Sequence, residues 1–406
     1  MTPPPPWRIA AAGMAALAVA MGIGRFAFTP LLPMMLADGV VGLAQASWLA
    51  TANYIGYLAG ALLCTFQPWL WRRFGLQGAA NGPWLVRAGL VATALLTLGM
   101  VAPWAAAWPA LRFAAGIASA VVFVYTSGWC LAVLARLGHP AMGALIYTGP
   151  GAGIVLSGLA ATALVALDQR AWIGWLAFGL LAALLTAVVW PVFRHPAEAP
   201  PTGSGGTAHP QPQPHGAGEV GLLAFGYGLA GFGYIITATF LPVIARQALP
   251  GSAWLDLFWP LFGGGVIAGA LLASRVRGQR DMRLMLAGCY AVQAAGVAAS
   301  LVSPTLAGFA AGSLLLGVPF TAITFFAMQE VRRVRPAQAA STMALLTALY
   351  GLGQIAGPPL AALMLSRSAT PAQGFTLSLE IAAAALAAGA VLFVALARRY
   401  PVASSH

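Results

Sequence analysis

GIGRFAFTPLLP at residues 22–33 recurs as GFGYIITATFLP at residues 231–242, which begins 209 positions later (231 minus 22). Both copies contain a Gly-x-Gly pair followed nine residues later by a proline (33 minus 24, and 242 minus 233). A second and weaker pair, GPGAGIVLSG at 149–158 and YGLGQIAG at 350–357, also aligns two glycines with two glycines. Two motifs repeated in the same order predict that the chain consists of two homologous halves.

The composition is typical of a membrane protein. Of the 406 residues, 60% are hydrophobic and 7% are charged, which is too few polar groups for the surface of a soluble domain. A helix needs about 20 apolar residues to cross a bilayer, and we predict an all-α protein with twelve such spans. The predicted spans are residues 9–36, 46–66, 84–102, 105–134, 141–166, 171–193, 219–244, 254–273, 284–302, 305–331, 340–366 and 374–397.

Arginine supplies all 20 basic residues, because the sequence contains no lysine. If the N-terminus is cytoplasmic, fourteen arginines fall in inside segments and three in outside loops. This agrees with the excess of basic residues that cytoplasmic loops of membrane proteins carry. We therefore expect both termini in the cytoplasm, and we attribute the net charge of +12 to this bias rather than to nucleic-acid binding. The inside set is Arg8, Arg72, Arg73, Arg136, Arg194, Arg275, Arg277, Arg280, Arg283, Arg332, Arg333, Arg335, Arg398 and Arg399; the outside set is Arg170, Arg246 and Arg367.

Residues 194–218 divide the predicted spans into six and six and are rich in proline, glycine and small polar residues. This composition is typical of a flexible linker, here on the cytoplasmic side. We therefore predict a six-helix bundle at 1–193 and a second one at 219–406. The linker histidines and the three cysteines lack the spacing of metal ligands, so neither a metal nor a cofactor is expected.

Two repeated halves of six spans with a cytoplasmic linker resemble the major facilitator superfamily of secondary transporters. Three stretches resemble its YbfB/YjiJ-like branch, namely GIGRFAFTPLLPMM at 22–35, ANYIGYLAGAL at 52–62 and GFGYIITATFLPVIAR at 231–246. The resemblance implies two pseudo-symmetric bundles, transport by alternating access, and a central path lined by spans one, four, seven and ten. The glycine and proline sequences GPGAG and GPP are expected to interrupt spans five and eleven.

The loops after spans two and eight are the gates that the resemblance implies. The first loop of the superfamily has an aspartate before its basic residues, whereas TFQPWLWRRFG contains only Arg72 and Arg73. The corresponding loop after span eight has Arg275 and Arg277, again without an acid at that position. Glu330, at the inner end of span ten, is expected either to pair with Arg275 or Arg277 as a gate contact or to form a solvated ion pair.

LRFAAGIASA, at residues 111–120 in span four, resembles the arginine motif of proton-coupled antiporters in the superfamily. Arg112, Gly116 and Ala120 have the matching spacing, although Ala115 stands where glutamine is usual. The resemblance implies proton coupling, with Arg112 in substrate binding or in coupling.

Arg25 is a charged residue deep in the first predicted span. Sixteen residues (25 minus 9) separate it from Ile9, which corresponds to about 24 Å of helix, somewhat beyond the membrane midplane. A charge at this depth costs at least about 2.5 kcal/mol. Arg25 therefore either faces a cavity and binds an anionic group, or bonds to backbone carbonyl groups at kinks near Pro30 and Pro33.

Polar and aromatic residues of other spans complete a candidate substrate pocket. Tyr234 is the repeat counterpart of Arg25, which predicts a similar depth across the pseudo-twofold axis. Arginine keeps its proton in proteins, so coupled protons would have to move on Glu380, on Asp256 or on the substrate itself. The other pocket candidates are Asn53, Tyr57, Tyr125, Tyr147, Tyr227, Thr321 and Gln354, each of which is alternatively a packing or interfacial residue.

These patterns predict a secondary active transporter of the bacterial inner membrane that moves a small organic solute with proton coupling. Two arginines within the spans favour an anionic or zwitterionic substrate. The alternatives are efflux of diverse neutral or cationic compounds, a permease subunit driven by a separate ATPase, and a non-transporting sensor on the same fold. An enzyme is not expected, because HExxH, GxSxG and paired catalytic acids are absent from the sequence. The expected partners are the bilayer, the solute and protons, and the chain is expected to be a monomer.

Overall fold

The computed structural model describes residues 4–74, 81–194, 216–252, 254–276 and 281–401, and nearly all of them are helical. In these ranges twelve helical segments are long and apolar enough to cross a membrane. Each begins and ends within a few residues of its predicted position, so the chain is a multi-pass membrane protein with the twelve expected spans.

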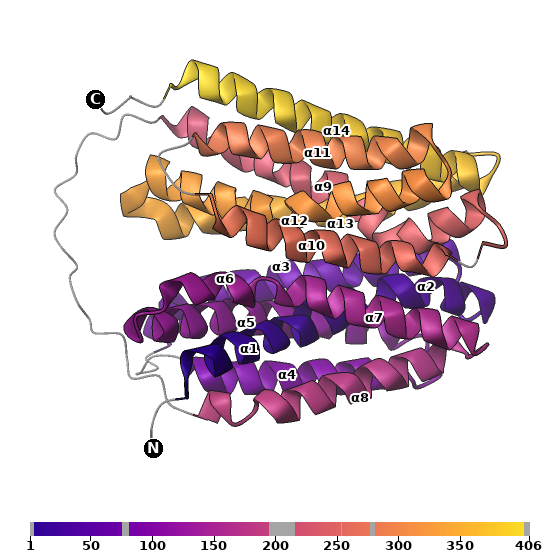
Figure 1. Ribbon diagram of the computed structural model, residues 1–406, viewed down its shortest axis with the longest axis horizontal. Coiled ribbons are helices and arrows are strands. Elements are labelled where there is room, and N and C mark those ends of the chain that lie inside the picture. The colour runs from indigo at the N-terminus through magenta and orange to yellow at the C-terminus, as the bar shows by residue number, and fades with distance from the viewer. Residues whose placement is uncertain (1–3, 75–80, 195–215, 253, 277–280, 402–406) are drawn as a thin grey trace.

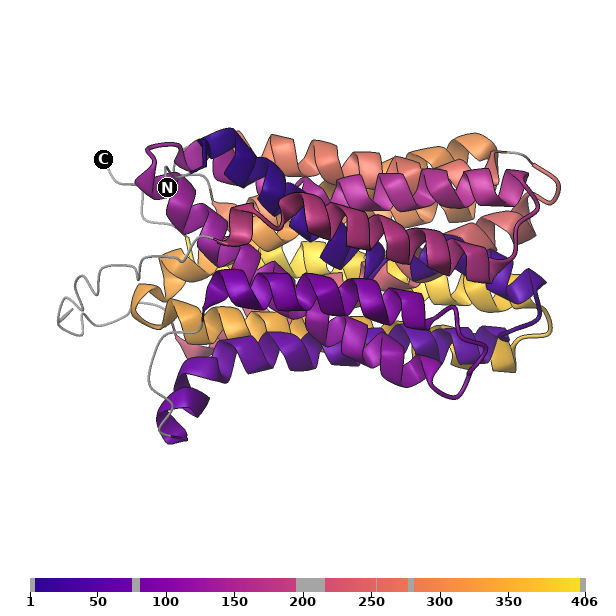
Figure 2. The same ribbon diagram turned by 90° about the horizontal axis from the view of Figure 1, so that it is seen from below.

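Two bundles lie side by side with their helices nearly parallel (Figure 1). Helix α1 begins and α14 ends at the same end of the molecule, which we call the terminal end; the other is the opposite end (Figures 1 and 2). The first bundle comprises α1 (Pro6–Leu17), α2 (Phe28–Ala37), α3 (Leu43–Arg73), α4 (Gly82–Gly99), α5 (Trp108–Arg136), α6 (Gly143–Ile146), α7 (Gly149–Ala166) and α8 (Ala171–Val189). The second comprises α9 (Ala217–Ala248), α10 (Phe258–Ser274), α11 (Met282–Val302), α12 (Leu306–Val334), α13 (Ala339–Arg367) and α14 (Pro371–Arg399).

The first span is broken near its middle. After α1 the chain forms a π-helix, Ala18–Ile23, and then four turn residues before α2 begins. The amide of Gly24 bonds to the carbonyl of the fifth preceding residue at 2.9 Å, and the amide of Phe26 does the same at 3.0 Å. Such π-segments in helices are frequent at functional sites. The distortion therefore precedes the prolines at which we expected kinks, and Pro33 lies inside α2.

Glycines of the repeated motifs pack the first span against the fifth and the seventh against the eleventh. A β-carbon on Gly22 would overlap the backbone of Gly153, and one on Gly353 would overlap the carbonyl of Gly228. Small residues allow helices to approach this closely. The same pairing in both bundles agrees with the repeat seen in the sequence.

The bundles contact one another through α7 with α10 and through α3 with α13. A β-carbon on Gly151 would lie 2.7 Å from the carbonyl oxygen of Gly263, and Gly351 faces Leu58. Span five is interrupted before Gly149, as expected. Span eleven is not interrupted, because α13 continues through GPP at 357–359.

Candidate functional site

Arg112 on α5 binds the broken turn of the first span. Its Nη1 donates to the carbonyl oxygen of Gly24 at 3.2 Å, and its Nη2 donates to that of Arg25 at 3.0 Å. Ser119, two turns further along α5, donates to the carbonyl of Ala20 at 2.7 Å. One of the two roles that the sequence suggests for Arg25 is bonding to backbone carbonyl groups at a helix break. In the structure Arg112 makes these bonds instead.

Asn53 on α3 supports this arrangement. It is fully buried, and its Nδ2 donates to the carbonyl oxygen of Arg112 at 2.9 Å. Close approach of α3 to α5 depends on Gly116, where a β-carbon would overlap the Asn53 backbone. Asn53 and Arg112 therefore hold the turn from which Arg25 projects.

The broken turn places the Arg25 side chain between the two bundles, where it is 3% exposed. Its Nη2 donates to Oε1 of Gln354 on α13 at 2.6 Å. The Nε2 of Gln354 in turn donates to the hydroxyl of Tyr234 on α9, also at 2.6 Å. Arg25 and its repeat counterpart Tyr234 thus contact the same amide group, which links the two bundles.

Aromatic rings surround the guanidinium. The Cζ of Arg25 lies 4.1 Å from the ring centroid of Tyr57 and 5.3 Å from that of Tyr54, both on α3, at distances typical of cation–π contacts. Around Tyr234, Phe320 packs edge-on at 5.0 Å, and Tyr350 stacks at 5.9 Å and also stacks on Tyr227 at 4.7 Å. We had not predicted Tyr54, Phe320 or Tyr350, although Tyr54 precedes Tyr57 by three residues and so shares its helix face.

Arg25 has no carboxylate partner in the part of the chain that the structure describes. Asp256 pairs with Arg246 at 2.5 Å near the opposite end, and Glu380 is exposed on α14. Neither predicted proton carrier therefore lies beside Arg25. Of the remaining acids, Asp38 and Asp168 follow α2 and α7 at the opposite end, Glu219, Asp281 and Glu330 lie at the terminal end of the second bundle, and Glu198 is outside the described residues.

Part of the Arg25 guanidinium is unoccupied. Within the described structure its Nε is buried and has no hydrogen-bond partner. Nε and Nη2 lie along one edge of a guanidinium, where a carboxylate can accept two parallel hydrogen bonds. Gln354 offers a single oxygen there. The hydroxyls of Thr237, one turn after Tyr234, and of Thr321, next to Phe320, are also buried without partners among the described residues.

The other predicted pocket residues lie on the terminal side of this centre. The hydroxyl of Tyr227 donates to Thr324 at 2.9 Å, and that of Tyr125 donates to Gln67 at 3.4 Å. Tyr147 packs against Phe123, with ring centroids 6.3 Å apart. Within the described ranges Tyr125 and Tyr147 make these contacts rather than contacts with Arg25, so their membership of the pocket stays a prediction.

Comparison with known proteins identifies the family. The sequence profile described as "Uncharacterised MFS-type transporter YbfB" matches residues 17–394. The chain belongs to this family. It is a family of transporters of the major facilitator superfamily and not of enzymes. No curated protein matches the chain.

Solved structures show the same fold as this YbfB-family transporter. The nucleoside transporter NupG is 15% identical with a TM-score of 0.65, and the comparison covers 96% of this chain and 98% of that one. A point mutant of NupG is 14% identical with a TM-score of 0.70, covering 96% and 99%. At these identities the likeness establishes the major facilitator fold alone.

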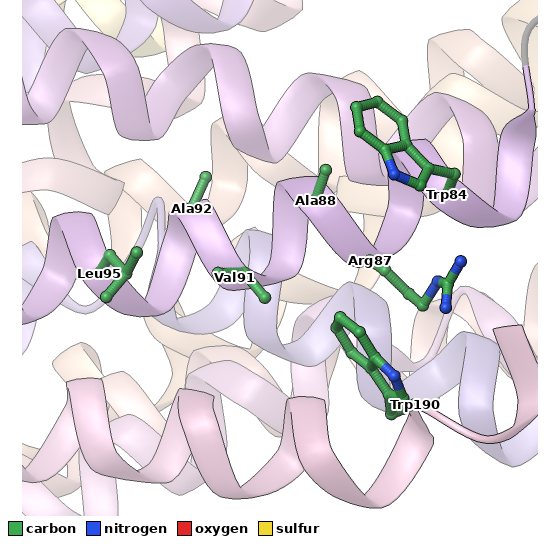
Figure 3. A pocket seen from close by; sticks show the side chains of 7 residues that line it. All are labelled: Trp84, Arg87, Ala88, Val91, Ala92, Leu95 and Trp190. Carbon is green, nitrogen blue, oxygen red and sulfur yellow. The ribbon is translucent and has the colours of Figure 1, made fainter. Parts of the chain in front are cut away.

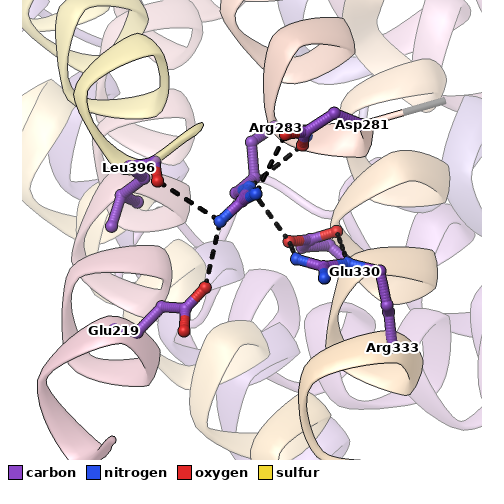
Figure 4. A network of polar contacts seen from close by, with 6 residues as sticks. All are labelled: Glu219, Asp281, Arg283, Glu330, Arg333 and Leu396. Atoms are coloured by element: carbon purple, nitrogen blue, oxygen red, sulfur yellow. Dashed lines mark hydrogen bonds and ion pairs between the residues drawn. The ribbon is translucent and has the colours of Figure 1, made fainter. Parts of the chain in front are cut away.

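The predicted gate residue Glu330 is paired inside its own bundle of the YbfB-family transporter. It contacts Arg333 at 2.5 Å and Arg283 at 3.4 Å (Figure 4). The expected pair with Arg275 is not formed, because Glu330 is fully buried whereas Arg275 is exposed at the end of α10. Arg73 is exposed at the end of α3; Arg277 and the side chain of Arg72 lie outside the described residues.

Arg283 is the centre of this network and is 1% exposed. It donates to Glu219 at 3.1 Å, to Asp281 at 2.9 Å and to the carbonyl of Leu396 at 3.2 Å (Figure 4). Burial raises the pKa of Asp281, but the hydrogen bonds and the charge of Arg283 lower it further, so the net pKa lies below its ordinary value. The network joins α9, α11, α12 and α14, and all its described members belong to the second bundle.

Proposed function

We propose that this YbfB-family protein is a secondary active transporter that moves a small organic anion, or a zwitterion through its acidic group, across the bacterial inner membrane. The observation that supports this substrate class is the buried guanidinium of Arg25, which has an unpartnered Nε and a neutral partner in Gln354. Arginine keeps its charge, and an anionic ligand supplies the missing counter-charge. A cationic substrate would be repelled by Arg25 and by Arg112.

In the proposed cycle the anion displaces Gln354 from Arg25. Hydrogen bonds in which both partners are charged are stronger than those to a neutral amide, so a carboxylate competes well for this edge. Arg25 belongs to one bundle, whereas Gln354 and Tyr234 belong to the other. Displacement therefore removes one link between the bundles, and this couples substrate arrival to their relative movement.

In the conformation that the structure shows, the substrate path is proposed to lead from Arg25 to the terminal end. Between the centre and the opposite end, Thr29 bonds to the carbonyl of Ala238 at 2.8 Å, and Tyr54 bonds to Thr239 at 2.9 Å. These contacts join the bundles. On the terminal side, Tyr57, Tyr147 and Tyr350 are partly exposed, as is Thr321. The arginine distribution predicts that the terminal end faces the cytoplasm. The proposed conformation is therefore open to the cytoplasm and closed to the outside.

Proton coupling is proposed to occur through the substrate itself. Glu380 is exposed on α14 and Asp256 is paired with Arg246, so neither is placed to exchange a proton with a ligand of Arg25. His139, the histidine that the described ranges contain, lies after α5 and outside the spans. A substrate that carries a proton on a second group, while its carboxylate binds Arg25, would transport that proton without a carrier residue.

The test is a thermal-shift screen of purified protein with acids and their uncharged amides as matched pairs, for example benzoate and benzamide. We expect at least one acid to raise the melting temperature, its amide to have no effect, and Arg25→Ala and Arg25→Lys to lose the response. Arg136→Ala, which removes an exposed arginine at the end of α5, is the control and should respond as wild type.

Hits that are cations or neutral compounds, and that still stabilise a folded Arg25→Lys protein, would contradict an anion site. That outcome would favour efflux of diverse neutral or cationic compounds. Flux of the stabilising acid into proteoliposomes then separates a transporter from a sensor that binds without moving its ligand.

A further inference from the structure

A groove on the outer surface of the first bundle runs between α4 and α8. Its volume is about 440 Å³. One end holds Trp84, Arg87 and Trp190, and the apolar remainder follows α4 (Figure 3). Trp84 and Leu95 are more than half exposed, so the groove faces the lipid when the protein is in a bilayer. The apolar lining is Ala88, Val91, Ala92 and Leu95.

Arg87 is a charged residue in this lipid-facing groove. It lies inside the span Gly82–Gly99, about 8 Å of helix from its start at the terminal end. No ion pair with a carboxylate is present for it among the described residues, and its buried Nε has no acceptor there. Its Cζ lies 5.1 Å from the ring of Trp190. A cation in a membrane span is unfavourable without a counter-charge, and the groove opens toward a bilayer that can supply one.

We propose that this groove binds one anionic phospholipid, with the phosphate on Arg87 and an acyl chain along the apolar residues of α4. Basic pockets between membrane helices on the cytoplasmic side favour anionic headgroups. Trp84 and Trp190 flank the arginine, as tryptophan does at the depth of the headgroups. The groove thus presents its charge at headgroup depth and its apolar surface at the depth of the chains.

The second bundle contains a comparable groove between α11 and α14, which are the repeat counterparts of α4 and α8. It has a volume of about 940 Å³ and ends at Arg398 and Arg399, again at the terminal end. Both halves of the repeat therefore place a basic end on a lipid-facing groove at the same side of the membrane. This site is independent of the transported substrate.

The test is native mass spectrometry of the full chain, delipidated in detergent and then incubated with palmitoyl-oleoyl phosphatidylglycerol or the phosphatidylcholine of the same chains. We expect preferential retention of phosphatidylglycerol. Arg87→Ala should lower the affinity for one phosphatidylglycerol by about fivefold. Arg136→Ala, which removes an exposed arginine outside the groove, should leave retention unchanged.

Ala92→Trp fills the apolar part of the groove and leaves Arg87 in place, so it should also lose the lipid. Arg87→Gln repeats the charge removal if Arg87→Ala is not monodisperse. Unchanged retention in both Arg87 variants would overturn the proposal. So would displacement of the lipid by inorganic phosphate at equal concentration, which would indicate a free-phosphate site. A lipid-free dimer that Ala92→Trp dissociates would overturn it as well, by making the groove a subunit contact.

Discussion

At the scale of single residues, Gln354 determines how Arg25 is bonded when no substrate is present. Gln354→Glu places a carboxylate on the guanidinium in place of the amide oxygen now 2.6 Å away. The resulting ion pair neutralises a charge that is already buried, so we expect the melting temperature to rise, by the equivalent of about 1 kcal/mol. The same variant should bind the stabilising acid at least about tenfold more weakly, since the internal carboxylate competes for Arg25.

Gln329→Glu is the control, because Gln329 is an exposed glutamine on α12 and the change adds the same charge away from the centre. It should bind the acid as wild type. A Gln354→Glu protein that melts lower than wild type and still binds the acid would show that the amide does not compete with the substrate.

The sequence was sufficient to place Arg25 and Arg112 within the spans and to pair Arg25 with Tyr234 through the repeat. It was not sufficient to assign the two arginines their different partners. Which arginine bonds to carbonyl groups depends on which turn is distorted, and the π-helix before Arg25 has no signature in GIGRFAF. Gln354 was identified as a pocket candidate, but its link between Arg25 and Tyr234 depends on how the bundles dock.

At the scale of helices, the Arg283 network fixes the terminal end of the second bundle, and Asp281 is its titratable group outside the spans. Asp281 accepts from the Arg283 side chain and also caps α11 through the amide of Arg283 at 2.9 Å. Its pKa is lowered on folding. Its carboxylate therefore stabilises the protein fully above the unfolded pKa of about 3.9, and this stabilisation is lost as the pH falls through the lower folded pKa.

We therefore expect Asp281→Asn to lower the melting temperature at pH 7, with a difference from wild type that shrinks as the pH falls below about 4. Thermal unfolding of the variant and of wild type in detergent, from pH 7 down to pH 3, measures the difference in melting temperature and its dependence on pH. Asp168→Asn, in the turn after α7, is the comparison for a carboxylate outside the network. A difference that stays constant down to pH 3 would mean that the ionised carboxylate does not contribute.

The helices also show where local sequence rules fail in a membrane bundle. Prolines 358 and 359 each remove a backbone donor, and GPP for this reason suggests an interruption. The structure continues α13 through them, because neighbouring helices and small local adjustments can support a proline in a membrane span. The interruption occurs instead in span one, where the packed neighbours Arg112 and Ser119 bond to the irregular backbone.

At the scale of the whole molecule, the hydrogen bonds that join the bundles in the described structure lie from the centre to the opposite end. Arg25 with Gln354 lies at the centre, and Thr29 with Ala238 and Thr162 with the Asp256 carbonyl lie further toward the opposite end. In an alternating-access transporter, such contacts must separate when the path opens to that side. A bulky side chain introduced into these contacts, which we call a wedge, should therefore shift the equilibrium from the state closed at the opposite end to the state open there.

Gly158 on α7 is suited to such a wedge. A β-carbon there would lie 2.6 Å from Cδ of Pro260 on α10, so Gly158→Val forces the bundles apart near the opposite end. The reporter is Cys64 on α3, which is partly exposed and lies two turns from Tyr57 on the terminal side. With Cys130→Ser and Cys289→Ser in the background, we expect Gly158→Val to slow labelling of Cys64 by a membrane-impermeant thiol reagent applied from the terminal side.

The matched control is Gly264→Val, because a β-carbon on Gly264 of α10 meets no atom within 4 Å. It adds the same side chain to the neighbouring helix without a wedge and should label at the wild-type rate. Gly158→Ala provides a smaller wedge if the valine variant does not fold. Labelling that is unchanged or faster in Gly158→Val would mean that the contact of α7 with α10 does not hold the opposite end closed. The change in the Cys64 labelling rate, measured against Gly264→Val, thus tests whether the contact of α7 with α10 helps to close the opposite end.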